Sequence, residues 1–307
     1  MALEPVTVRY RDVTGAVRRV RVQARVPSGA TSPAPVVVWS HGGTEGRRAP
    51  VRLAQEWSDA LVGAGYAVVV IAHPSRGPAE ERALCAALGP ATCATYPSLG
   101  WDRAHDVSAV LDRLEAEAAP GGSLAGQIDP SLVVHVGHSA GGAAALLLVG
   151  ARREIAGEVR DLSDPRVVAA VSSSGPGVGP HLDQGFDDTS FATVDRPHLL
   201  LTGVGDTTEG TSGADRRRVA DAVPASHAHL AWFTDDTAAH GTFDLDTSAC
   251  RRRGGTPEVC DRHTTVITSV VAAFLDAHVR DDPAARAWLA SDAASRLGRG
   301  TVELTVP

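Results

Sequence analysis

Lysine is missing from this sequence. All 29 basic residues are arginines, and 36 acidic residues outnumber them, which gives a net charge of −7. Schiff-base catalysis, a Ser–Lys dyad and a phosphate-binding P-loop each need an ε-amine, so these three chemistries are excluded. An acidic chain also lacks the basic face that nucleic-acid binding requires, so no nucleic-acid partner is expected.

Long hydrophobic runs are missing as well. The runs "AVVVIA" and "AAALLLVG" are far shorter than the roughly 18 residues of a membrane span, so none is expected. The opening "MALEPVTVRY" has no apolar signal-peptide core. The protein is therefore either cytoplasmic or given in mature form. A strand that starts almost at once favours the mature form and a secreted or periplasmic location.

Cysteine is scarce and lacks the C-x-x-C spacing of zinc ribbons and thioredoxin-like motifs. The four cysteines form two close pairs, Cys85 with Cys93 and Cys250 with Cys260. Two disulfides that close short loops would fit an exported protein, and four free thiols are the alternative. No metal site and no cofactor are expected.

Apolar strands and helical segments alternate along the rest of the chain, which predicts a mostly parallel sheet with helices on both faces. Residues 6–27 alternate apolar and polar side chains around a glycine, which predicts an antiparallel hairpin before that sheet. No linker or repeat divides the chain, so 1–307 is expected to be one domain and, we expect, a monomer. The predicted strands end at 43, 77, 139, 177, 206 and 236, and the predicted helices cover 51–65, 101–122, 140–153, 213–223, 263–280 and 283–297.

The stretch "GHSAGG" follows the apolar run "SLVVHV" and places Ser139 between a predicted strand and a predicted helix. G-x-S-x-G in that position is typical of a nucleophile elbow, where glycines let the chain turn sharply and the serine projects above the sheet. The alternative is an ordinary N-cap serine, although a cap does not require flanking glycines.

A glycine-rich turn, "HGG", ends the strand before it. An oxyanion hole needs two backbone N–H groups aimed at one point. Ala140 would supply one, and Gly43 the other, with Gly42 as the alternative. The turn could equally be a tight turn without any electrostatic role.

An acid and a histidine follow later strand ends. Asp206 comes after "HLLLTGVG", and His240 lies in the loop between the last predicted strand and the closing helix. The chain order Ser, Asp, His is that of α/β-hydrolases. In such a triad, His240 takes the proton of Ser139 and Asp206 holds the imidazole. Asp235 and Asp236 are alternative acids.

Other histidines have less specific positions. His138 occupies the variable place of the elbow and is expected to pack, and His41 is expected to hydrogen-bond within its turn. His227 and His229 could share a strand face. A metal pair there lacks a third ligand, so partly exposed strand histidines are the preferred interpretation.

With "VVVWSHGG", "GHSAGG", "HLLLTGVGD" and "AAHGTF", the chain resembles the α/β-hydrolase family over most of residues 6–290. It is similar to the group of dienelactone-hydrolase-like and platelet-activating-factor-acetylhydrolase-like proteins, which includes bacterial cutinase-type polyester hydrolases. The resemblance implies hydrolysis of a carboxylic ester through an acyl-enzyme, without a cofactor, on small-molecule, lipid-like or polymeric esters.

Two departures bear on the substrate. Where polyester hydrolases offer an aromatic residue and a tryptophan, this chain has Gly43 and "SSSGPG", and only 4% of its residues are aromatic. The nucleophile position holds Ser139 rather than the cysteine of dienelactone hydrolases. The leading hypothesis is a serine carboxylesterase. A peptidase or amidase, an acyltransferase and a non-catalytic binding protein on the same fold are the alternatives.

Overall fold

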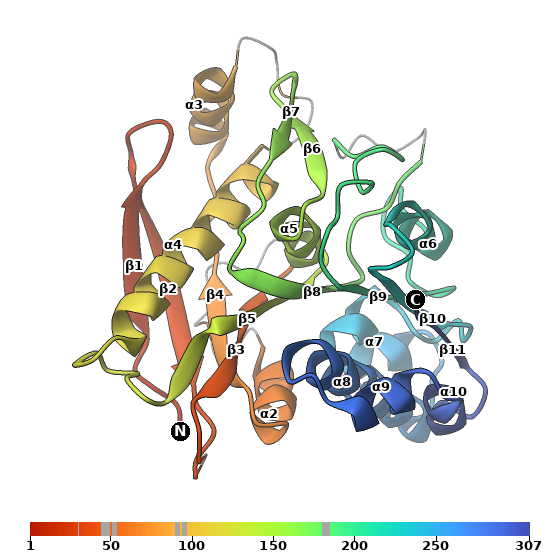
Figure 1. The fold of residues 1–307 in the computed structure, drawn as a ribbon. Coiled ribbons are helices and arrows are strands. Elements are labelled where there is room, and N and C mark those ends of the chain that lie inside the picture. Colours follow the sequence, from red (N-terminus) through yellow and green to blue (C-terminus); the bar gives the residue numbers. More distant parts are fainter. Residues whose placement is uncertain (30, 44–49, 51–53, 90–92, 94–96, 180–184) are drawn as a thin grey trace.

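The computed structural model describes the whole chain except residues 30, 44–49, 51–53, 90–92, 94–96 and 180–184. A nine-stranded sheet runs through its centre (Figure 1), in the order β1-β2-β4-β3-β5-β8-β9-β10-β11. The strands are β1 (Val6–Arg11), β2 (Val17–Arg25), β3 (Ala34–Ser40), β4 (Ala67–Ala72), β5 (Ile128–His138), β8 (Val167–Ser173), β9 (His198–Gly203), β10 (Ala228–Phe233) and β11 (Val302–Thr305).

The middle six strands are parallel, and antiparallel strands flank them on both edges. This matches the predicted mostly parallel sheet with its N-terminal hairpin. The inner strands β3, β4 and β9 are buried along their whole length because both faces of the sheet are covered there. In β3, Val36 and Val38 pack into one core, and Val37 and Trp39 into the other.

Helices form a layer on each face of the sheet. Figure 1 shows α4, α5 and α6 on one side, with α2, α8 and the short C-terminal helices on the other. The parallel strands all end at the same edge, between these layers, where their loops meet. The helices are α2 (Gln55–Gly63), α3 (Pro78–Leu88), α4 (Trp101–Ala118), α5 (Ala140–Leu148), α6 (Gly213–Ala222), α7 (Thr247–Arg252), α8 (Pro257–Val279), α9 (Pro283–Leu289) and α10 (Ala293–Leu297), with 3₁₀ turns η1 (Pro97–Leu99) and η2 (His240–Asp244).

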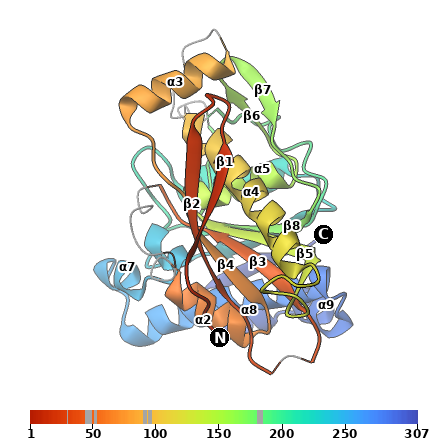
Figure 2. The ribbon, with the colours of Figure 1, turned by 90° about the vertical axis from the view of Figure 1, so that its left-hand side faces the viewer.

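One supersecondary unit differs from the sequence prediction. The helix expected over 140–153 ends at Leu148, and a hairpin of β6 (Arg152–Ile155) and β7 (Glu158–Asp161) follows. This hairpin lies beside α3 at one end of the molecule (Figure 2), where Leu84 packs with Ile155 in a small separate core. The charged "ARREIAGEVRD" stretch has no alternation clear enough to predict a strand.

Other element boundaries also differ. The closing helix α8 begins at Pro257, six residues before the predicted start, because Thr256 caps it and proline fits its first turn. The predicted helix 283–297 divides into α9 and α10. The first residues of the predicted helix 51–65 lie outside the described part of the chain. Among the described helices, none is both long and apolar enough to cross a membrane.

Candidate active site

Ser139 lies at the turn between β5 and α5 with a φ of 54° and a ψ of −116°. Such a conformation is costly for a residue with a side chain and persists only where the surroundings enforce it. Its carbonyl opens the helix by accepting from the Ala143 N–H at 3.1 Å. Its hydroxyl, however, makes no capping hydrogen bond. Ser139 therefore occupies the N-cap position without using its side chain as a cap.

The flanking glycines are required by close backbone contacts. A Cβ on Gly137 would overlap the carbonyl oxygen of Gly141, and a Cβ on Gly141 would overlap the carbonyl oxygen of Ser40. These positions join β5, α5 and β3 so tightly that only glycine fits. The sharp turn predicted from the pentapeptide is thus the observed geometry.

Asp206 and His240 meet at the ends of β9 and β10. Nδ1 of His240 lies 3.0 Å from Oδ1 of Asp206 and 2.5 Å from Oγ of Ser174. Ser174 in turn donates to the same carboxylate oxygen at 2.7 Å, and Thr202 donates to the other at 2.7 Å. The carboxylate is completely buried, whereas His240 is partly exposed. His240 is held through Nδ1, which leaves Nε2 as the ring atom available to a substrate or nucleophile.

A buried arginine also contacts the acid. Nε of Arg216, on α6, lies 3.2 Å from Oδ1 of Asp206, with the arginine side chain only 4% exposed. Burial on its own would raise the pKa of Asp206. The hydrogen bond from His240, the charge of Arg216 and the hydrogen bond from Ser174 outweigh burial and hold that pKa below its usual range. Asp206 is therefore a carboxylate at neutral pH.

The glycine-rich turn after β3 is held by a second buried arginine. Arg103 of α4 donates to the carbonyl oxygens of His41, at 2.5 Å, and Gly42, at 2.8 Å. The Gly42 carbonyl also accepts from Nδ1 of His41 at 2.6 Å. In a trans peptide the next N–H points the opposite way. The Gly43 N–H therefore points away from Arg103.

A chain of buried polar groups supports this turn from behind. The His73 N–H donates to Nε2 of His41 at 3.1 Å. The His73 ring bonds to Asp106 at 2.9 Å and to Ser40 at 2.8 Å. Burial and the charge of Arg103 lower the pKa of His41 to about 2, so its ring is neutral. The turn is thus fixed through neutral histidines as well as through Arg103.

Ser139 and the glycine-rich turn share one cavity of about 320 Å³, which we call the serine cavity. Ser139, Ala140 and Gly43 contribute to its wall, whereas Gly42 is not among its described lining residues. Ala140 is the first residue of α5, so its N–H has no partner inside the helix. Further described lining residues are Leu99, Phe186, Thr208 and Arg216.

No hydrogen bond joins the Ser139 and His240 side chains within the described part of the chain. Catalytic hydrogen bonds are often long without substrate and shorten when it binds. The His138 ring lies beside that of His240, 4.7 Å between centroids, and its Nε2 contacts the His240 carbonyl at 3.0 Å. Burial lowers the pKa of His138 to about 3, so it packs as a neutral ring under the His240 loop.

The alternative acids lie elsewhere. Asp235 accepts from Thr237 and lies 3.5 Å from His263, and Asp236 is exposed. His229 is more buried than expected and contacts Nε2 of His278 at 3.1 Å. Among the described residues no group of three or more potential ligands could hold a metal ion.

Both cysteine pairs are bonded in the structure, Cys85 to Cys93 and Cys250 to Cys260. The first joins Cys85 of α3 to Cys93 in the loop after that helix, and the second links α7 to α8. This is the pairing that the sequence suggests. Two disulfides favour an extracellular or periplasmic environment, because reducing compartments keep thiols free.

Three side chains at this site were missed by sequence reasoning. Ser174 lies in a serine triplet at a strand end, and Arg103 and Arg216 are two arginines among many. A signal for Arg103 does exist. Arg103 and Asp106 lie on the face of α4 that carries the apolar residues and is therefore predicted to be buried. A charged residue on a buried face needs a partner, so both residues could have been singled out. Neither Ser174 nor Arg216 has a comparable signal.

A scan against protein-family models finds no match, and a search of curated proteins finds none either. Solved structures do match, with 931 chains in all. One is a ferulic acid esterase from Streptomyces cinnamoneus, with a TM-score of 0.61 and 20% sequence identity, covering 98% of this chain and 95% of that one. Together with the parallel sheet, this likeness confirms the α/β-hydrolase fold. The fold hosts many functions, so the activity has to be argued from the site.

Proposed function

We propose that this protein is a serine hydrolase of carboxylic esters that works through an acyl-enzyme. Ser139 is the nucleophile, His240 the general base and acid, and Asp206 the group that orients His240. Gly43 and Ala140 supply the oxyanion N–H groups. The observation that carries the proposal is Ser139 itself. It has a positive φ, a hydroxyl unused for capping and a place in the cavity wall beside Gly43.

The chemistry follows from these positions. Oγ of Ser139 attacks the ester carbonyl carbon while its proton passes to Nε2 of His240. The negative charge that develops on the carbonyl oxygen is stabilised by the two N–H groups and the α5 N-terminus. When the C–O bond breaks, His240 returns the proton to the leaving alcohol. Water then attacks the acyl-enzyme by the same route and frees the acid and Ser139.

Two further observations support an ester as the substrate. One solved structure that shares this fold is named a ferulic acid esterase. The serine cavity has a wall of mixed polarity. Phe186 and Ala143 contribute apolar side chains, whereas Thr208 and Arg216 contribute polar ones. Such a wall suits a small ester with an apolar and a polar part. Polyester and lipid-like esters are the alternative substrates.

Localisation and assembly remain part of the proposal. The two disulfides support a secreted or periplasmic enzyme. We also propose that residues 1–307 act as a single domain and as a monomer. Assignment to the dienelactone-hydrolase-like and platelet-activating-factor-acetylhydrolase-like group stays a prediction from the motifs.

The deciding experiment is Ser139→Ala assayed on p-nitrophenyl butyrate. Loss of the nucleophile should lower kcat by about 10⁴-fold or more. The matched control is Ser28→Ala, at an exposed serine in the loop between β2 and β3, which should retain full activity. A fluorophosphonate should label the native protein on Ser139, as located by mass spectrometry. An active Ser139→Ala variant would refute the assignment.

A further inference from the structure

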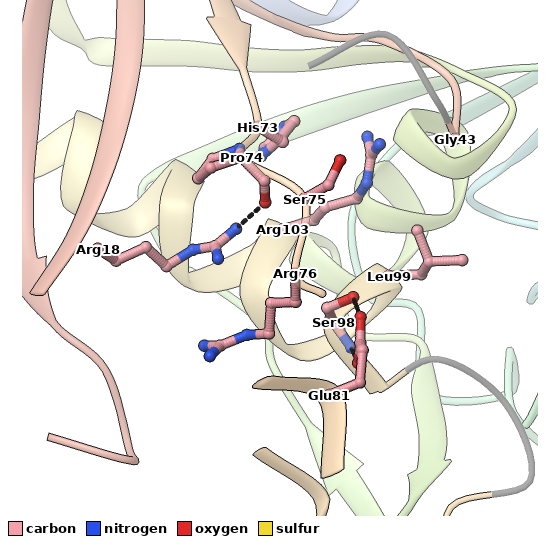
Figure 3. Close-up of a pocket in the computed structure, with 10 residues that line it drawn as sticks. All are labelled: Arg18, Gly43, His73, Pro74, Ser75, Arg76, Glu81, Ser98, Leu99 and Arg103. Atoms are coloured by element: carbon pink, nitrogen blue, oxygen red, sulfur yellow. Dashed lines mark hydrogen bonds between the residues drawn. The ribbon is translucent and has the colours of Figure 1, made fainter. Parts of the chain in front are cut away.

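A second cavity, also of about 320 Å³, adjoins the serine cavity. We call it the arginine cavity, after three arginines in its wall. Gly43 and Leu99 line both cavities, so the two lie on either side of these residues. Figure 3 shows Leu99 and Gly43 on one side of the hollow and Arg18 on the other. A molecule whose carbonyl oxygen lies at the Gly43 N–H can therefore reach into both.

The charges facing this hollow are unbalanced. Its described wall contains the guanidinium groups of Arg18, Arg76 and Arg103 but a single carboxylate, that of Glu81. The aspartates that neutralise two of these arginines lie behind the wall. Arg18 pairs with Asp106 at 2.7 Å, and Arg76 with Asp102 at 2.6 Å. The cavity therefore faces the positive ends of these pairs.

Arg103 adds a charge that no described carboxylate contacts directly, although the charge of Asp106 acts on it. Its guanidinium donates to two neutral carbonyl oxygens, and no carboxylate lies within salt-bridge distance of it among the described residues. It is only 3% exposed, so water screens its charge weakly. Burial lowers its pKa only to about 10, so it remains charged at neutral pH.

The wall also holds donors that have no protein partner. Within the described part of the chain, Nη1 of Arg76 and Oγ of Ser75 make no hydrogen bond, although the other guanidinium nitrogens of Arg76 are bonded to Asp102 and Asp12. Glu81, by contrast, is already occupied, because its carboxylate accepts from the side chain and the backbone N–H of Ser98. The groups of the wall that still lack a partner are therefore hydrogen-bond donors, which a ligand with acceptor atoms would satisfy.

We propose that the arginine cavity is a subsite for a carboxylate carried by one half of the ester substrate. This inference rests on the proposed function, because it takes the scissile carbonyl to lie at Gly43. A planar carboxylate matches the guanidinium geometry and can accept from Nη1 of Arg76 or from Oγ of Ser75, which point to different parts of the hollow in Figure 3. The preferred substrates are then half-esters or esters of hydroxy acids, whose anionic end lies in the arginine cavity.

The test compares isosteric carboxylate and carboxamide substrates. Monomethyl adipate and methyl adipamate place the group on the acyl half. 4-Butyryloxybutanoate and 4-butyryloxybutanamide place it on the alcohol half. In one of the two pairs kcat/KM should favour the carboxylate by about tenfold, the value of one good charge-assisted hydrogen bond. That preference should fall with added salt. A ratio of one or below in both pairs overturns the proposal.

Variants at an exposed position keep the test independent of folding. Ser75 is exposed, and its side chain makes no hydrogen bond to any described residue. Ser75→Asp therefore places a negative charge in the cavity and should reverse the preference. Ser75→Asn adds similar bulk without charge and should leave the carboxylate preferred. Arg82→Gln removes an exposed positive charge on α3 outside the cavity wall and should not change the ratio. A Ser75→Asp variant with the native ratio contradicts the proposal.

Failure of the proposed function gives a different pattern. In that case the native protein hydrolyses neither carboxamide substrates nor p-nitrophenyl butyrate. Binding of adipate compared with adipamide, measured by calorimetry on the native protein and on Ser75→Asp, then still tests the cavity. Equal binding of the two compounds would overturn the subsite, whereas selective adipate binding lost in Ser75→Asp would support it.

Discussion

Two buried arginines hold different parts of the site around Ser139: one holds the turn after β3, and the other lies against Asp206. Arg103 donates to two neutral carbonyl oxygens of the turn after β3. Arg216 lies against the charged carboxylate of Asp206. The first arginine fixes where a backbone N–H points, and the second changes how much negative charge faces His240. One side of the site depends on position and the other on charge.

The two sides differ in their supporting residues as well. Behind the turn, His41, His73 and Ser40 form a chain of hydrogen bonds between neutral groups, and the chain ends at the buried Asp106. Beside Asp206, the hydroxyls of Ser174 and Thr202 donate to a carboxylate. Hydrogen bonds to a charged group are stronger than those between neutral groups. Substitutions on the two sides should therefore differ in size and in kinetic signature.

The largest expected effect is on the charged side. Asp206→Asn removes the carboxylate and favours the wrong tautomer of His240, so kcat should fall by about 10⁴-fold. Steady-state kinetics on p-nitrophenyl butyrate measure this effect. Asp235→Asn is the matched control and should keep native kinetics, because Asp235 pairs with His263 instead. The reverse result would transfer the acid role to Asp235.

A smaller effect is expected from the turn. Arg103→Met removes both hydrogen bonds to the turn and should misplace the Gly43 N–H, lowering kcat by about 100-fold, as loss of an oxyanion donor does. KM should change little. Arg103→Lys should recover part of kcat, because a lysine ammonium can reach one of the two carbonyls but lacks the paired N–H groups with which the planar guanidinium contacts both. If kcat instead falls only in proportion to the folded fraction, measured by circular dichroism, Arg103 is merely structural.

The smallest effect, and the one that separates charge from position, is expected at Arg216. In Arg216→Gln the Asp206 carboxylate loses a neutralising charge and stabilises the His240 imidazolium more strongly. The acid limb of the kcat/KM profile should therefore move to higher pH, with about a tenfold loss of activity on that limb. Arg217→Gln, at an exposed arginine of the same helix, should leave the profile unchanged. An unmoved acid limb in Arg216→Gln would show that Arg216 acts by position alone.

The main architecture could be predicted because its signals are local. Continuous apolar strands, glycines that permit close backbone contact and the chain order of Ser139, Asp206 and His240 all appear in the sequence. The structure brings Asp206 and His240 into contact and places Ser139 beside Gly43 in one cavity. The sequence does not show that the Gly42 carbonyl turns toward Arg103 and accepts a hydrogen bond from it, and this became clear only from the structure.

The rest could not be predicted because it depends on contacts between distant segments. Arg18 lies on β2 but pairs with Asp106 of α4, a separation of 88 residues. The β6–β7 hairpin is charged and gains its stability by packing against α3. Because every basic residue is an arginine, Arg18, Arg76 and Arg216 do not stand out in the sequence, and only Arg103 has a signal in the apolar period of α4. For the other three, only the fold shows their place at the site.

The buried histidines around the site link folding to protons. Burial lowers the pKa of His135 and of His138 to about 3, from 6.5. The unfolded chain therefore takes up protons more readily than the folded one below pH 6.5. Above that pH these two histidines do not lower the free energy of unfolding. Below it, each histidine lowers the free energy of unfolding by about 1.4 kcal/mol for each further unit of acidification, down to about pH 3. These two rings lie beside Ser139 and behind the turn after β3, so acid destabilises the fold through residues packed against the candidate site.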